Sequence, residues 1–125
     1  MNYKQFNQFC GSLPATTYVM QWGGSHVWKV GGQQGGKVFA IGGWVDEGKL
    51  GFTFKVSPMN FEVLQFRLGV RPAPYLASRG LKWLQYYAEP GLSDAELKDV
   101  LRSSHRLASL NLTKKRQKQL GLNQD

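Results

Sequence analysis

The sequence predicts an α+β domain in which one antiparallel sheet of about five strands carries helices on one face. Over residues 16–56 and 82–88, apolar and polar side chains alternate, as in strands with one buried and one solvated face. Near both ends of the chain the apolar residues instead recur at helical spacing. The 15 glycines among 125 residues cluster between the apolar runs and indicate tight turns. A parallel sheet would need unbroken apolar runs separated by helices, and the sequence has neither.

The first expected element is a helix over residues 2–10, which Asn2 caps and Gly11 closes. Its apolar residues recur at helical spacing: Tyr3, Phe6, Phe9 and Cys10. Because Cys10 is the only cysteine, the sequence excludes an internal disulfide and a multi-cysteine metal site. Its place among aromatic residues predicts a small buried side chain that fills space in the core.

Short strands are expected next, paired in succession. One begins at Thr16, and a second runs over His26–Val30 after a turn at Gly23-Gly24. The glycine-rich stretch Gly31–Gly36 is then a hairpin connection to a third strand over Lys37–Ile41.

The clearest strand pattern covers residues 49–56 and predicts one buried and one wet face. The inward residues are expected to be Leu50, Phe52, Phe54 and Val56, and the outward ones Lys49, Gly51, Thr53 and Lys55. We expect this strand to lie near a sheet edge, where its two lysines discourage pairing between molecules. The sequence therefore predicts a monomer or a weak dimer.

A second helix is expected to begin at Ser57-Pro58, with serine as the cap and proline in the first turn, and to end at Gly69. Its buried stripe is predicted to comprise Phe61, Leu64 and Leu68. Residues 70–80 are predicted to form a proline-bearing loop, and residues 82–88 the last strand.

Ser93 and Glu96 have the spacing of a capping box, which predicts the start of a final helix that runs to about residues 107–110. Its inward residues are expected to be Leu97, Val100, Leu101, Leu107 and Ala108. The whole chain is therefore predicted to be one domain over residues 1–112, followed by a basic C-terminal tail over residues 113–125.

The charge balance is basic, with 16 Lys and Arg against 8 Asp and Glu and a net charge of +8. A surplus of this size in a small domain favours polyanionic partners. The first residues lack the pattern of a secretory signal, and no apolar run approaches the ~18 residues of a membrane span. We therefore expect a cytoplasmic protein without a membrane partner.

Residues that could carry catalysis are few. His26 and His105 are far apart and have no metal-ligand spacing. The string Gly23–Val27 begins like a nucleophile elbow but lacks the closing glycine. Acidic residues occur where a turn or a helix start explains them. The sequence predicts no catalytic residue, metal or cofactor, and we expect a protein that is not an enzyme.

One group of residues combines positive charge with aromatic rings. Its members are Lys29, Lys37, Arg71, Tyr75, Arg79, Lys82 and Trp83. Cationic groups neutralise phosphates and aromatic rings stack on bases, so the group is a candidate DNA-binding surface. The two lysines on either side of the glycine-rich hairpin would make it a wing along a phosphate backbone. The alternatives are aromatic residues that belong to the core, a solvated rim of cations, and an ordinary surface hairpin.

Several strings resemble the MmcQ/YjbR family of small bacterial proteins, in matching order from about residue 4 to residue 118. They are Val27–Gly32 followed by Lys37–Ala40, Pro72–Gly80 with Lys82-Trp83, and Leu92–Asp94 leading into Glu96-Leu97. The resemblance implies a one-domain α+β fold, described as a double wing and related to the frataxin-like fold. It also implies DNA binding, which is assigned to that family largely from its shape. Iron binding of the frataxin kind is not implied, because the acidic helix ridge that it needs is absent.

The leading hypothesis is a non-enzymatic protein that binds DNA weakly and mostly without sequence preference, through phosphates more than base edges. The alternative is a protein-interaction module of the secretion-chaperone type, which would use apolar sheet surface. Binding to DNA should collapse with salt, whereas apolar binding to a protein should survive it.

Overall fold

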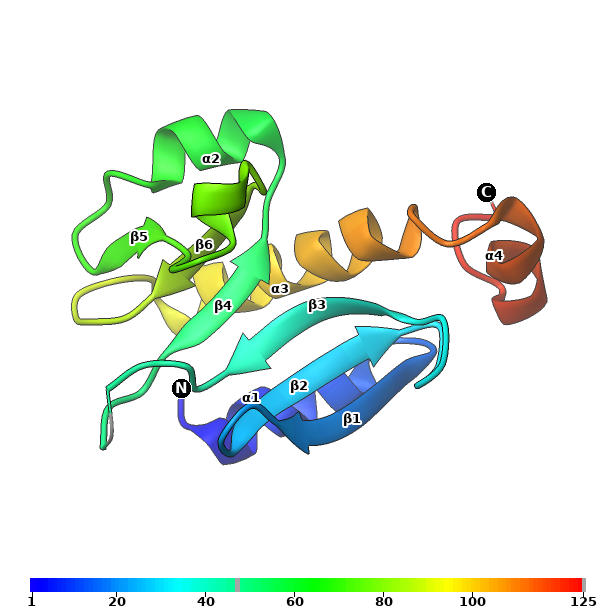
Figure 1. Ribbon diagram of the computed structural model, residues 1–125, viewed down its shortest axis with the longest axis horizontal. Coiled ribbons are helices and arrows are strands. Elements are labelled where there is room, and N and C mark those ends of the chain that lie inside the picture. The colour runs from blue at the N-terminus through cyan, green and yellow to red at the C-terminus, as the bar shows by residue number, and fades with distance from the viewer. Residues whose placement is uncertain (47, 125) are drawn as a thin grey trace.

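The computed structural model describes residues 1–46 and 48–124, which form a six-stranded sheet and the helices that pack against it (Figure 1). In chain order the elements are α1 (Tyr3–Ser12), β1 (Thr16–Gln21), β2 (Ser25–Val30), β3 (Lys37–Gly42), β4 (Phe52–Lys55), α2 (Pro58–Leu64), β5 (Val70–Pro72), the 3-10 helix η1 (Ala77–Arg79), β6 (Trp83–Tyr86), α3 (Asp94–Ser109) and α4 (Lys114–Leu120). The strands are antiparallel in the order β1-β2-β3-β4-β6-β5. The predicted α+β class is confirmed.

The sheet has one strand more than predicted. The additional strand is β5, a three-residue element within the stretch that the sequence analysis assigned to a loop. It escapes a pattern search because it is short and ends in Pro72, which cannot donate to a ladder. The proline is tolerated because β5 is an edge strand.

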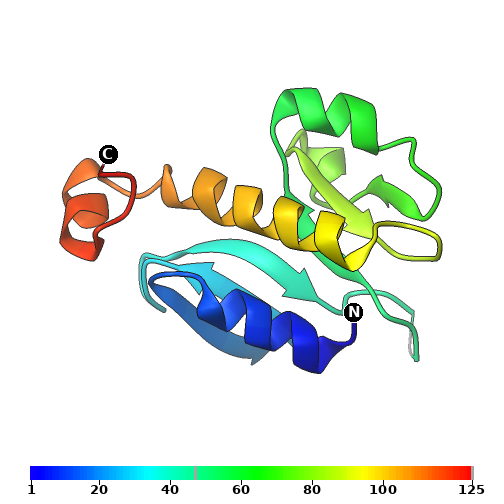
Figure 2. The ribbon, with the colours of Figure 1, turned by 180° about the vertical axis from the view of Figure 1, so that it is seen from behind.

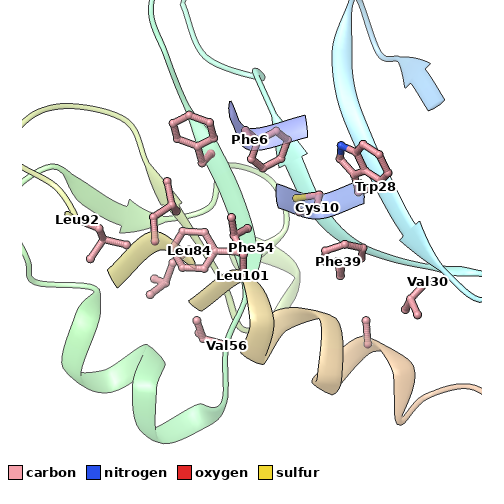
Figure 3. Close-up of a cluster of buried hydrophobic side chains, with 14 of the residues drawn as sticks. Phe6, Cys10, Trp28, Val30, Phe39, Phe54, Val56, Leu84, Leu92 and Leu101 are labelled. Atoms are coloured by element: carbon pink, nitrogen blue, oxygen red, sulfur yellow. The ribbon is translucent and has the colours of Figure 1, made fainter. Parts of the chain in front are cut away.

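Helices α1 and α3 lie on the same face of the sheet (Figure 2). Between them and the strands lies the main hydrophobic core (Figure 3). Its fully buried side chains include Phe6, Cys10, Val30, Phe39, Phe54, Leu84, Leu97 and Leu101. The predicted burial of Cys10 is thus confirmed, and this burial raises the pKa of its thiol well above the usual range.

The first helix begins as predicted and ends later. The side chain of Asn2 accepts a hydrogen bond from the Gln5 amide at 2.8 Å, and the Gln5 side chain caps Asn2 in return. The helix continues through Gly11 to Ser12, so the predicted end is wrong. A Cβ at Gly11 would sit 3.1 Å from the Trp28 ring, so glycine serves close packing there.

A serine from α3 closes an irregularity in the sheet. The register of β2 against β3 shifts at Trp28/Lys29, where β3 bulges. The hydroxyl of Ser104 donates to the Phe39 carbonyl at 2.6 Å and accepts from the Lys55 amide at 2.8 Å. This fully buried side chain therefore substitutes for ladder bonds between β3 and β4.

Three predictions for residues 49–56 need correction. Strand β4 begins only at Phe52, and Leu50 is 47% exposed because the ladder does not reach it. Thr53 is fully buried, because loops and side chains cover the second sheet face. The strand lies between β3 and β6, so its lysines guard no edge.

Helix α2 starts at the predicted cap, since the Ser57 hydroxyl accepts from the Asn60 amide at 3.2 Å. Phe61 is buried and Leu64 partly so. The helix ends at Leu64, before the predicted Gly69, and Leu68 is exposed. The expected stripe is therefore one turn too long.

The predicted capping box of α3 is present, and of its predicted inward residues three are buried and two partly buried. Residues 113–125, expected as a basic tail, contain α4, which Thr113 caps through the Arg116 amide at 3.0 Å. Leu112 and Leu122 on either side of α4 are buried in the core cluster. These contacts join α4 to the body of the domain.

Candidate functional site

The sheet face opposite α1 and α3 is named the open face below, and Figure 1 looks onto it. One row of cross-strand neighbours crosses all six strands on this face: Val19, Val27, Ile41, Thr53, Gln85 and Arg71. Within residues 1–46 and 48–124 no α-helix covers the row, yet its four central members are at most 2% exposed. Loops must therefore supply the cover.

Three aromatic residues from three connections provide that cover. Trp22 follows β1, Trp44 follows β3, and Tyr75 precedes η1. With strand residues below them they surround an apolar hollow of about 480 Å³, the aromatic hollow. Its lining comprises Trp22, Val38, Ile41, Trp44, Tyr75, Leu76 and Trp83.

The backbone of these three aromatic residues is unusual. Five non-glycine residues in the described part of the chain have positive φ, and three of them are Trp22 at 54°, Trp44 at 66° and Tyr75 at 70°. The left-handed region costs a bulky residue about 1–3 kcal/mol, and such strain persists only where the surroundings impose it. Strained aromatic residues therefore converge on one hollow.

A buried amide holds the Trp44 connection in place. Gln85 Nε2 donates to the Trp44 carbonyl at 3.0 Å and to Thr53 Oγ1 at 3.1 Å. Its Oε1 accepts from Arg71 Nε at 3.0 Å and from Arg71 Nη2 at 2.8 Å. The side chain of Arg71 also lies over the Tyr87 ring, 4.2 Å from its centroid. One polar network thus links an edge-strand cation to the loop that roofs the hollow.

Four cations lie on the open face, and three of them pair with or contact residues that line the hollow. Lys29 and Lys55 pair across the ladder with Val38 and Trp83, which line it. Arg79 Nη1 donates to the Tyr75 hydroxyl at 3.3 Å, and Arg71 belongs to the network described above. Within residues 1–46 and 48–124, none of the four forms an ion pair with an acidic side chain.

Five of the seven sequence-predicted site residues gather on this face: Lys29, Arg71, Tyr75, Arg79 and Trp83. Two do not. Lys37 pairs with Val30, whose side chain enters the core, so Lys37 leaves the sheet on the helix-covered side. Lys82 points to α2, where its Nζ lies 4.7 Å from the Phe61 ring centroid. The two hairpin lysines thus leave opposite faces of the sheet.

Sequence reasoning missed four residues that build the site: Trp22, Trp44, Lys55 and Gln85. In the sequence, Trp22 continues the alternation of Tyr18 and Met20, but it lies in the turn that follows β1. A glutamine between Leu84 and Tyr86 in an apolar strand was the available signal for the buried network.

A second hollow of about 600 Å³ adjoins Arg71 and includes Tyr86, Tyr87 and Leu50 in its lining. Its lining also contains the carboxylates of Asp46 and Glu89. These acids make it less suited to an anionic partner than the aromatic hollow.

The acidic, histidine and cysteine side chains of the described residues form no metal-binding cluster. No three His, Cys, Asp or Glu among residues 1–46 and 48–124 come together. His26 Nδ1 lies 2.8 Å from the Tyr18 hydroxyl, and His105 Nε2 lies 2.8 Å from the Pro14 carbonyl oxygen. No helix in the described ranges has the length and apolar character needed to span a membrane.

Two solved structures share this architecture. The crystal structure of Deinococcus radiodurans protein DR2400, described with the domain DUF419, superposes with a TM-score of 0.83 and 22% identity, over 97% of this chain and 88% of that one. A Pseudomonas syringae protein superposes with a TM-score of 0.69 and 18% identity, over 86% of this chain and 99% of that one. At these identities the likeness shows the fold alone.

No curated protein matches the chain. The family model described as YjbR matches residues 11–107, which include every strand, α2, η1 and most of α3. That match agrees with the resemblance found in the sequence, and the chain belongs to the YjbR family.

Proposed function

We propose that this protein is a non-enzymatic nucleic-acid-binding protein that contacts the phosphate backbone through the open face. The observation that carries the proposal is the gathering of Lys29, Lys55, Arg71 and Arg79 on the sheet face that also holds the aromatic hollow. Within residues 1–46 and 48–124 these cations have no acidic partner, so they are available to neutralise phosphates. Aromatic rings add contact area that tolerates any sequence.

The expected binding is dominated by release of counterions. Each neutralised phosphate of a duplex lowers the slope of log K against log salt by about 0.9, so four contacts give about −3.6. The open face presents strands and loops without a recognition helix, and we therefore expect random and designed sequences to bind almost equally.

The test compares two double variants that each remove two positive charges. Lys29→Ala/Arg79→Ala changes the open face, and Lys37→Ala/Lys82→Ala changes the two predicted residues that lie elsewhere. Anisotropy of a labelled duplex is measured over a salt series. In the first variant, the slope of log K against log salt should become shallower by the equivalent of about two phosphate contacts. The second variant should keep the wild-type slope. Equal effects, or no binding at low salt, would contradict the proposal.

A second candidate function is protein interaction, and a different surface favours it. Four apolar side chains on and after α2 are between 68% and 79% exposed: Met59, Val63, Phe66 and Leu68. Clustered exposed apolar residues mark interaction sites in soluble proteins. Binding of a protein partner there would survive high salt and would be weakened by Phe66→Ser, which leaves the open face unchanged.

A further inference from the structure

We infer that the aromatic hollow binds an unpaired nucleobase, so that the open face prefers single-stranded nucleic acid to duplex. The inference rests on the proposed function and assigns a ligand to one part of the same surface. Phosphates engage the cations, and a base leaves the strand to stack on the rings between them.

The hollow has the surface that a base requires. It is apolar apart from a small polar fraction, and Trp22 and Tyr75 at its mouth are 55% and 63% exposed. The Trp22 and Trp44 rings are 6.2 Å apart between centroids and tilted by 31°, so they form one continuous aromatic wall. A volume of about 480 Å³ lies within the range of small-molecule pockets, about 300–1,000 Å³.

The backbone supports a ligand-binding purpose for these rings. Trp22 at φ 54° precedes Gly23 and Gly24, which also have positive φ, so the turn uses glycine where only conformation matters. More than half of the Trp22 surface stays exposed, so burial offsets only part of the strain at this left-handed position. Strain of this kind concentrates at binding sites.

Charge complementarity selects the occupant. The hollow lies between Lys29, which neighbours Val38 on one side, and Arg79, which contacts Tyr75 on the other. A quaternary ammonium, which aromatic cages also bind, would be repelled by this rim. An apolar peptide would leave the cations unused. A nucleotide within a strand has a backbone phosphate on each side of its sugar, so its base can use the rings while the phosphates use the cations of the rim.

The base must be unpaired because base pairing and stacking hide its ring faces in a duplex. Only a strand whose bases are free, or a base turned out of the stack, can present a face to tryptophan. Single strands should therefore bind more tightly than duplexes of the same length.

The structure provides a direct optical readout. Three of the four tryptophans line the hollow, and the fourth, Trp28, lies in the core on the other side of the sheet. Stacking of a base should therefore quench most of the protein's tryptophan emission. The probes are an oligothymidine of about twelve nucleotides, an abasic strand with the same number of phosphates, and a duplex of the same length.

We expect the oligothymidine to quench the emission and to bind at least about tenfold more tightly than the abasic strand at low salt, as stacking of one base predicts. Trp22→Gly and Tyr75→Gly should each remove most of this difference. Both should keep the thermal midpoint, because glycine accepts their positive φ. Phe66→Ala, which truncates an even more exposed ring outside the hollow, is the matched control and should change nothing.

The outcomes separate the two claims. Equal, salt-dependent binding of oligothymidine and abasic strand would overturn the inference and leave the proposed function standing. Tighter binding of the duplex would also overturn the inference alone. No binding of any probe at low salt would overturn both, and quenching by an uncharged apolar peptide alone would assign the hollow to a protein partner.

Discussion

Replacement of Gln85 by leucine tests the network that positions the Trp44 connection. Leucine has a similar shape, but it leaves the Trp44 carbonyl and the Thr53 hydroxyl without the partners they have at 3.0 and 3.1 Å. Each buried polar group left unsatisfied costs about 1–3 kcal/mol, and burial of leucine carbons offsets part of that loss. Arg71 is exposed and can turn to water, so its contribution is small.

The net expectation for Gln85→Leu is a loss of about 2 kcal/mol in the free energy of unfolding, measured by urea denaturation. Thr53→Val is the matched control, because it removes one partner of the amide and keeps the bond to Trp44. It should cost about 1 kcal/mol and leave near-ultraviolet circular dichroism unchanged, whereas Gln85→Leu should alter that spectrum. A Gln85→Leu variant as stable as the wild type, with the same spectrum, would refute the claim that this amide holds the loop.

Three further predictions concern the fold. Phe54→Ala should lower the unfolding free energy by about 3–5 kcal/mol, because the ring is fully buried, and an unchanged urea midpoint would contradict its place in the core. Burial lowers the pKa of His105 below its ordinary value of 6.5, so the unfolded chain takes up a proton more readily than the folded protein. The free energy of unfolding is therefore highest above pH 6.5 and decreases as pH falls below it. His105→Phe should flatten the stability profile between pH 7.5 and 5.5, and an unaltered slope would argue against this. The hydrogen bond from Arg67 lowers the pKa of Glu96 to about 2. The ionised Glu96 therefore contributes to the free energy of unfolding above pH 4.5, and this contribution is lost as pH falls towards 2. Arg67→Ala should weaken this acid dependence in thermal melts at low salt, and an identical acid limb would show that the pair contributes nothing.

The alternation in the sequence predicted the core side of the sheet because burial there follows the strand period. Phe54 and Val56 are buried as expected, since α3 covers that face. The same pattern failed for Leu50 and Thr53, because alternation reports neither where a ladder starts nor whether loops cover the second face. Neither fact is encoded in the period of the strand itself.

The candidate site was predicted in part, since the open face gathers five of its seven predicted residues. Lys37 was grouped with Lys29 by proximity along the chain, yet the pleat sends them to opposite sides. Trp22 and Trp44 could not be assigned to the site from periodicity, because both lie in connections outside the strands, where alternation does not apply. Gln85 joins the site through hydrogen bonds with Trp44, Thr53 and Arg71, which lie 41, 32 and 14 positions away in the chain.

Binding of nucleic acid by the open face is tested most directly by a nuclear magnetic resonance titration with oligothymidine. The titration follows the indole N–H signals of the four tryptophans. Trp22, Trp44 and Trp83 line the hollow, whereas Trp28 Nε1 donates to Asn7 Oδ1 at 2.9 Å on the helix-covered face and serves as an internal control. The three hollow signals should shift together and return when salt is raised, and the Trp28 signal should stay in place. Stationary hollow signals at saturating ligand, or a shift of Trp28 alone, would contradict binding by the open face.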